Sequence, residues 1–266
     1  MKETIRNMQL FLFDMDGTLY LGDRLYDFTI ELLDTIKNTG GKYLFMTNNS
    51  SKSVEDYIKK LAKLGVFATR EDFITSSQAT AYYLHKNHEG QRLYVCGTES
   101  LKAELRREGF CVTTNIEEVD CIVMGFDTEL TFQKLLAVSY LLLTRPELPY
   151  LATNPDLVCP TEFGSVPDCG SVCTMIYNAT GKRPIVIGKP SPLMPELAMD
   201  RLGIAKDKTC VVGDRIYTDV KSGLAAGITG ILVMSGETTY EILNESEEKP
   251  HFIMESAKEI LDILKA

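Results

Sequence analysis

Residues 9–18, QLFLFDMDGT, carry the strongest indication of the fold. Gln9–Phe13 is an almost entirely apolar run, which is typical of a strand buried on both faces of a parallel sheet. Two carboxylates, Asp14 and Asp16, follow this run directly, and Gly17 allows a sharp turn behind them. We therefore expect a central strand that ends at a charged site.

The segments around this strand repeat the order strand then helix. Further strands are expected at Tyr43–Met46, Ile185–Ile187, Thr209–Val212 and Ile231–Val233, and helices at Phe28–Ile36, Ser53–Leu64, Leu193–Leu202, Tyr217–Ala226 and Ser256–Leu264. Such alternation predicts βαβ units, and therefore an α/β fold with a parallel sheet.

The middle of the chain repeats the pattern on a smaller scale. Strands are expected at Arg92–Cys96 and Cys121–Gly125, and helices at Leu101–Glu108, Thr131–Thr144 and Val172–Ala179. Five prolines between residues 146 and 167 predict a stretch rich in loops that reaches Gly170.

Composition and net charge exclude some classes of function. The 266 residues carry a formal net charge of −9, with 28 basic and 37 acidic side chains. This balance argues against nucleic acid as a partner, because phosphate backbones attract clustered Lys and Arg. A small anionic substrate stays compatible with it, since a local pocket can be positive on an acidic protein.

We expect the protein to be cytoplasmic. The first residues lack the layout of a signal peptide, and no apolar run approaches the ~20 residues of a membrane span. Seven cysteines, an odd number, fit reduced thiols better than a disulfide framework. Cys169 and Cys173 are four residues apart and could share a helix face, where packed thiols are favoured over a zinc site.

Four segments offer polar groups at or just beyond the ends of expected strands. Asp14 and Asp16 would repel each other without a cation, and Mg²⁺ prefers such oxygen ligands. The other groups are Thr47 with Asn48, then Lys189, then Asp214 with Asp219. Ligands of open parallel sheets bind at the carboxyl ends of the strands, so the four segments could converge on one site.

Each segment also has a purely structural interpretation. The Asp14–Asp16 turn could cap a helix, and Thr47 and Asn48 could belong to a cluster that caps the next helix. Lys189 alone is more often a solvated surface lysine. Asp219 could be an acid in the first turn of a helix, where the helix dipole favours it.

Together, DMDGTL (14–19), TNN (47–49), GKP (188–190) and GDRIYTD (213–219) resemble the four ordered motifs of the haloacid dehalogenase-like (HAD) phosphohydrolases. The longer forms DGTLYLG and TNNSSKS are similar to the NagD / 4-nitrophenylphosphatase branch, subfamily IIA. The resemblance implies a Rossmann-like catalytic core over residues 1–80 and 184–266. It also implies an inserted α/β cap of the C2 type over residues 81–183.

The resemblance implies a role for each motif residue. Asp14 would be the nucleophile that forms an aspartyl-phosphate, and Asp16 would be the general acid and base. Mg²⁺ would be held by Asp14, the main-chain carbonyl of Asp16 and Asp214, with support from Asp219. The phosphoryl group would be bound by Thr47, Asn48 and Lys189.

The implied activity is an Mg²⁺-dependent phosphatase acting on a small phosphorylated metabolite, such as a nucleoside monophosphate or a sugar phosphate. The segment from Asn154 to Ser171 is the candidate for a cap loop that contacts the leaving group. Two alternatives stay open: a phosphotransferase or mutase on the same core, and a non-catalytic protein that binds a phosphorylated ligand. Neither nucleic acid nor membrane is expected as a partner, and a homodimer is compatible with the sequence.

Overall fold

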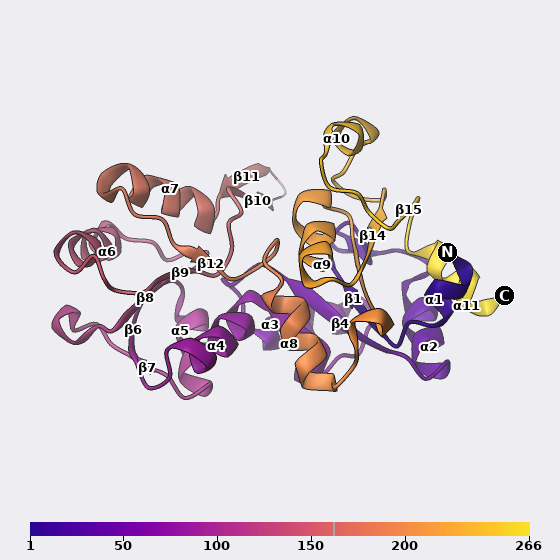
Figure 1. Cartoon of the computed structure of the whole chain (residues 1–266), viewed down its shortest axis with the longest axis horizontal. Coiled ribbons are helices and arrows are strands. Elements are labelled where there is room, and N and C mark those ends of the chain that lie inside the picture. Colours follow the sequence, from indigo (N-terminus) through magenta and orange to yellow (C-terminus); the bar gives the residue numbers. More distant parts are fainter. Residues whose placement is uncertain (162) are drawn as a thin grey trace. The chain divides into compact units, whose positions relative to one another are not determined.

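The computed structural model describes residues 1–161 and 163–266, and its elements are labelled in Figure 1. The chain divides into two compact units. The first comprises Met1–Thr47, Val54–Ile74 and Lys189–Ala266, and the second comprises Asn48–Ser53 and Thr75–Gly188.

These boundaries differ from the expected ones at residues 80 and 184. Asn48–Ser53 belongs with the second unit because Ser76 Oγ donates a hydrogen bond to the Asn48 carbonyl and Ser50 Oγ bonds Thr153 Oγ1. That the second unit acts as a cap stays a prediction.

A six-stranded sheet forms the centre of the first unit. Its strand order is β15-β14-β13-β1-β4-β5, and the pairs from β15 to β4 are parallel. The strands are β1 (Leu10–Phe13), β4 (Lys42–Thr47), β5 (Phe73–Thr75), β13 (Thr209–Gly213), β14 (Thr229–Val233) and β15 (Phe252–Met254). A short hairpin, β2 (Tyr20–Leu21) with β3 (Arg24–Leu25), follows β1.

Strand β1 lies between β4 and β13, as its apolar sequence predicts. All four of its residues are at most 1% exposed, because helices cover both faces of the sheet around it. After β1 the chain crosses over to β4, on one side of β1 in the sheet. After β13 it crosses over to β14, in the opposite direction. Right-handed crossovers in the two directions place their helices on opposite faces. Figure 1 shows α2 beside α11 and α8 beside α9, and both pairs are in contact.

The helices of the first unit are α1 (Lys2–Arg6), α2 (Thr29–Asn38), α3 (Val54–Lys63), α8 (Leu193–Leu202), α9 (Lys221–Ala226), α10 (Tyr240–Glu245) and α11 (Lys258–Lys265). Most of them begin and end close to the predicted positions, whereas α1 and α10 were not predicted. The helix expected over Tyr217–Ala226 is divided. Ile216–Val220 forms a wide π-helical turn before α9, and such turns are frequent at functional sites.

The second unit has its own parallel sheet, with the strand order β12-β9-β8-β6-β7. Its strands are β6 (Arg92–Cys96), β7 (Cys111–Val112), β8 (Cys121–Met124), β9 (Tyr150–Ala152) and β12 (Ile185–Val186). Its helices are α4 (Ser76–Asn87), α5 (Glu99–Arg107), α6 (Phe132–Thr144) and α7 (Cys169–Thr180). Cys169 and Cys173 do share one buried face of α7, with their sulfur atoms 3.9 Å apart.

Two expectations for this part of the chain were wrong. The stretch from Pro146 to Gly170 was expected to be rich in loops, but it contains β9 and an antiparallel hairpin, β10 (Val158–Thr161) with β11 (Gly164–Pro167). The strand at residues 185–187 was assigned to the catalytic core. This strand is β12. It pairs with β9 of the second sheet, with Ile185 opposite Leu151 and Val186 opposite Ala152.

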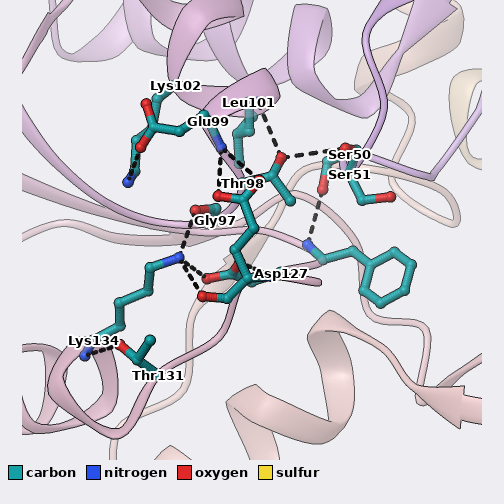
Figure 2. A network of polar contacts seen from close by, with 12 residues as sticks. Ser50, Ser51, Gly97, Thr98, Glu99, Leu101, Lys102, Asp127, Thr131 and Lys134 are labelled. Atoms are coloured by element: carbon teal, nitrogen blue, oxygen red, sulfur yellow. Dashed lines mark hydrogen bonds and ion pairs between the residues drawn. The ribbon is translucent and has the colours of Figure 1, made fainter. Parts of the chain in front are cut away.

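A polar network joins strand ends inside the second unit (Figure 2). Lys134 Nζ donates to Asp127 Oδ2 at 2.7 Å and to the carbonyls of Gly97 and Glu129. Gly97 follows β6, while Asp127 and Glu129 follow β8, so this one ammonium group links α6 to the ends of both strands.

Across the part of the chain that the structure describes, no helix combines the length and the apolar character needed to span a lipid bilayer.

Candidate active site

The central strands of the first sheet bring two acidic residues side by side. Strands β1 and β13 pair in parallel with Phe13 opposite Val212, and the Asp14 amide donates to the Val212 carbonyl at 2.9 Å. Asp14 comes directly after β1, and Asp214 comes directly after β13. The shared register therefore carries both carboxylates to the same edge of the sheet.

A third carboxylate completes the cluster. Asp219 lies in the π-helical turn and is fully buried, and its Oδ2 accepts the Arg215 amide at 3.1 Å. Each of Asp14, Asp214 and Asp219 offers one oxygen atom that lies within 4.8 Å of the other two, so the group could hold a metal ion.

A buried lysine connects two of these carboxylates. Lys189 is 3% exposed, and its Nζ donates to Asp14 Oδ1 at 2.6 Å and to Asp219 Oδ1 at 2.5 Å. It also donates to the carbonyl of Met46 in β4 at 3.3 Å. Lys189 is therefore part of the cluster and not a solvated surface lysine.

The charges of the cluster do not balance. Burial raises the pKa of Asp14 to about 8 despite the opposing effect of Lys189, and repulsion by Asp219 and Asp214 adds to the rise. Burial likewise raises the pKa of Asp214 to about 6. Burial alone would lower the pKa of Lys189, but Asp14 and Asp219 raise it above its usual value. Three carboxylates facing one ammonium favour an added cation, which would keep all three ionised.

Asp214 offers a buried oxygen atom to such a cation. Its Oδ2 accepts the Glu237 amide at 2.7 Å, whereas its Oδ1 is buried and has no hydrogen-bond partner among the described residues. Buried carboxylate oxygens are rarely left without a partner. Hard oxygen donors of this kind are the ligands that Mg²⁺ prefers, so the residues present fit that ion.

The Asp16 side chain lies outside the carboxylate cluster. It is exposed and accepts the Gly22 amide at 3.3 Å. The adjoining Gly17 has φ +82°, and a Cβ atom there would lie 2.5 Å from Asp214 Oδ2. The turn after β1 thus requires glycine and leaves the Asp16 carboxylate facing solvent.

Thr47 and Asn48 fall in different units. Thr47 is the last residue of β4 and is buried in the first unit. Asn48 belongs to the second unit, where its Nδ2 donates to Asp156 Oδ2 at 3.0 Å. Asp156 also accepts Asn154 Nδ2 at 3.0 Å, and these two residues lie in the segment expected to contact the leaving group. Glu162, within that same segment, lies outside the described residues.

Sequence reasoning missed the loop after β14. Glu237 contacts Asp214 through its main-chain amide, and Ser235 Oγ donates to the carbonyl of Gly17 at 2.7 Å. A signal was present, because Ser235, Gly236 and Thr238 come shortly after an expected strand, as the other polar segments do.

Comparison with known proteins agrees with this geometry. A family model for haloacid dehalogenase-like hydrolases matches residues 11–111, and a HAD-hydrolase-like model matches residues 186–260. The chain belongs to the haloacid dehalogenase-like hydrolases. The two matches include the β1 and β13 strand ends that carry the carboxylates of this hydrolase.

Its relatives and structural neighbours identify the branch. The hydrolase is 34% identical to the acid sugar phosphatase of Staphylococcus haemolyticus, over 93% of each chain. It is 35% identical to the 5′-nucleotidase YutF of Bacillus subtilis, over 94% of this chain and 96% of that one. The 4-nitrophenylphosphatase of Thermotoga maritima superposes with a TM-score of 0.91 at 38% identity, covering 99% of this chain and 98% of that one. The hydrolase is therefore a member of the NagD / 4-nitrophenylphosphatase-like branch.

Proposed function

We propose that this hydrolase is an Mg²⁺-dependent phosphatase that releases phosphate from small phosphomonoesters through an aspartyl-phosphate. It is an enzyme, a phosphomonoester hydrolase of the HAD type. The observation that carries the proposal is the pairing of Asp14 with the buried Lys189 inside a cluster of three carboxylates. A carboxylate beside a fixed ammonium group and a cation site is suited to attack a phosphoryl group, whose negative charge those cations offset.

The first step forms a bond between an Asp14 carboxylate oxygen and phosphorus, while the bond from phosphorus to the alcohol oxygen breaks. Asp16 gives a proton to that leaving oxygen, and its exposed carboxyl group would turn toward a bound ester by giving up its long hydrogen bond with the Gly22 amide. Asp16 then takes a proton from water as the water oxygen attacks the aspartyl-phosphate. Asp14 is regenerated, inorganic phosphate leaves, and Asp16 has regained the proton that it gave.

Mg²⁺ would be held by Asp14, the main-chain carbonyl of Asp16 and Asp214, whose Oδ1 has no hydrogen-bond partner among the described residues. The ion would offset negative charge on the phosphoryl oxygens. Asp219 would support the site indirectly, because both of its oxygens already accept protein hydrogen bonds, from Lys189 and from Arg215.

Three residues would bind the phosphoryl group. Lys189 would neutralise charge on it, as its ammonium group is anchored beside the nucleophile. Thr47 and the directly following Asn48 would add hydrogen bonds from the end of β4, without the repulsion that a further carboxylate would introduce.

The names of the relatives support a substrate class for this hydrolase. Relatives named acid sugar phosphatase and 5′-nucleotidase support sugar phosphates or nucleoside monophosphates as substrates. We propose that the second unit is a cap of the C2 type, in which the segment around Asn154 and Asp156 contacts the leaving group. All seven cysteines are free thiols, which supports a reducing location such as the cytoplasm.

The test is phosphate release from a panel of phosphomonoesters, with Mg²⁺ and with chelator, for the wild type and for Asp14→Asn. Asp34→Asn, on the exposed face of α2, is the matched control. We expect release that depends on Mg²⁺, is abolished in Asp14→Asn and is unchanged in Asp34→Asn. Unaltered release by Asp14→Asn would reject the covalent mechanism. No release from any panel member by a wild type that binds Mg²⁺ would favour transfer to another acceptor, or binding alone.

A further inference from the structure

The loop between β14 and α10 contacts two of the segments that carry the site. Ser235 Oγ donates to the Gly17 carbonyl at 2.7 Å, in the turn behind Asp14. The Glu237 amide donates to Asp214 Oδ2 at 2.7 Å, and the Thr238 amide donates to the Asp214 carbonyl at 3.2 Å. We call residues 235–238 the β14 loop. It holds the Asp14 turn and the Asp214 segment together.

Gly236 brings the backbone of this loop unusually close to the carboxylate. A Cβ atom at position 236 would lie 2.0 Å from Asp214 Oδ2 and 2.4 Å from its Cγ. Gly17 approaches the same oxygen from the Asp14 turn, where a Cβ would lie 2.5 Å away. The Asp214 carboxylate is therefore confined between two glycines, and any side chain at position 236 would displace it.

The β14 loop also distinguishes the two oxygens of Asp214. The Glu237 amide donates to Oδ2, which leaves Oδ1 as the buried oxygen without a hydrogen-bond partner in the part of the chain that the structure describes. Thr238 fixes the loop from its other end, because its Oγ1 accepts the Ile216 amide at 3.1 Å. The loop thus constrains both the position of the carboxylate and the direction in which its free oxygen points.

We propose that the β14 loop is a positioning element that orients Asp214, so that Oδ1 is the oxygen presented to the metal ion. This inference rests on the proposed metal site. Gly236 and Ser235 are its decisive residues, and neither is a catalytic residue, since both act through Asp214 or Gly17. Partners that orient metal ligands in this way typically change metal affinity 10–100-fold when they are altered.

The first experiment titrates the intact enzyme with Mn²⁺ alone, followed by electron paramagnetic resonance of the free ion, without substrate. We expect Gly236→Ala to weaken Mn²⁺ binding at least about tenfold. The Mg²⁺ concentration for half-maximal phosphate release should rise by a similar factor, and kcat at saturating Mg²⁺ should recover toward the wild-type value. A merely structural role would lower kcat or thermal stability without this recovery.

Two further variants separate backbone from side chain. Glu237→Gln keeps the main-chain amide that contacts Asp214 and a side-chain oxygen that can still accept from Arg215, so its Mn²⁺ affinity should stay within about twofold of the wild type. Ser235→Ala removes the hydrogen bond to Gly17, and its affinity should fall severalfold; it also provides the test if Gly236→Ala fails to fold. Ser246→Ala, outside the loop, should behave as the wild type.

Wild-type Mn²⁺ affinity in folded Gly236→Ala, or in Ser235→Ala if the glycine variant does not fold, would overturn the inference. Phosphate release could still depend on Mg²⁺ in that case, so the proposed function would survive. Conversely, a wild type that binds Mn²⁺ but releases no phosphate would reject the phosphatase while the effect of the loop on metal binding still stood.

Discussion

Lys189 is the residue on which the charge of the site depends most. Its ammonium group lies between Asp14 and Asp219 and is almost completely buried. Without it, two acidic side chains would lie close together with no fixed positive charge between them. Removing one partner of a buried ionic group is far more damaging than removing an exposed one.

Replacement of Lys189 by Met should therefore affect both activity and stability. We expect Lys189→Met to lower kcat by at least about 100-fold, because loss of a preorganised charge at a reacting centre typically costs this much. Its thermal midpoint without metal should also fall. Lys206→Met, at an exposed position of the same unit, is the matched control for phosphate release and thermal unfolding. Wild-type kcat in Lys189→Met would show that the ammonium group takes no part in the reaction.

At this scale the sequence predicted much of the site. Asp14 and Asp214 could be found because polar residues that follow buried parallel strands gather at one edge. Lys189 was expected from the GKP motif and from its place after an expected strand, and the second reason was incorrect because that strand belongs to the other sheet. The contact of Glu237 with Asp214 could not be predicted, because it uses a main-chain amide that nearly every residue possesses.

Helix α6 illustrates how one side chain can fix a whole element. Lys134 lies near the beginning of α6, and its ion pair with Asp127 is nearly buried, with side-chain exposures of 16% and 1%. Figure 2 shows the same ammonium group reaching Gly97 as well. The helix is therefore attached to the ends of β6 and β8 by a charge and not by apolar packing alone.

Loss of this attachment should lower the stability of the protein. We expect Lys134→Met to lower the free energy of unfolding by about 3–5 kcal/mol, because the Asp127 carboxylate would stay buried without its partner. Lys258→Met, which removes an exposed ion pair with Asp262, should cost at most about 1 kcal/mol. Urea denaturation of both variants measures the difference. If the two variants lost the same free energy of unfolding, the Asp127 carboxylate would have found another partner or gained access to water.

Elements were predictable where their apolar residues formed a continuous run or a clear helical period. Four-residue β1 and helices such as α8 were recognised from continuous or periodic apolar residues. Strand β9 was missed because its three residues lie between Pro149 and Pro155, and prolines usually indicate loops. The π-helical turn before α9 was also missed. Its apolar spacing resembles that of an α-helix, and the difference lies in the backbone, where the Val220 amide donates to the carbonyl of Arg215, five residues earlier.

At the scale of the whole molecule, two units each have a parallel sheet and an apolar core of their own. All three carboxylates that could hold a metal ion belong to the first unit. Binding of the ion should therefore stabilise the two units unequally, since a ligand stabilises only the structure that binds it.

Hydrogen exchange measured by mass spectrometry can detect this difference. Saturating Mg²⁺ should slow amide exchange at residues 14–17, 213–219 and 235–238, while β8 and β9 should exchange at unchanged rates. Asp214→Ala, which removes a proposed ligand, should show no Mg²⁺-dependent protection anywhere. Equal protection of both sheets would indicate that metal binding is coupled to the second unit.

The position of β1 has a consequence for how the chain acquires its structure during synthesis. Its neighbour β13 begins at residue 209, so β1 emerges from the ribosome long before one of its two partners exists. At 5–20 residues per second, the delay is roughly 10–40 s. Throughout that time the nascent chain exposes an apolar strand edge, while most of the second unit emerges as one continuous segment that can fold in the interval. We therefore expect the nascent chain to bind chaperones that cover unpaired strands until the last third of the chain has been synthesised.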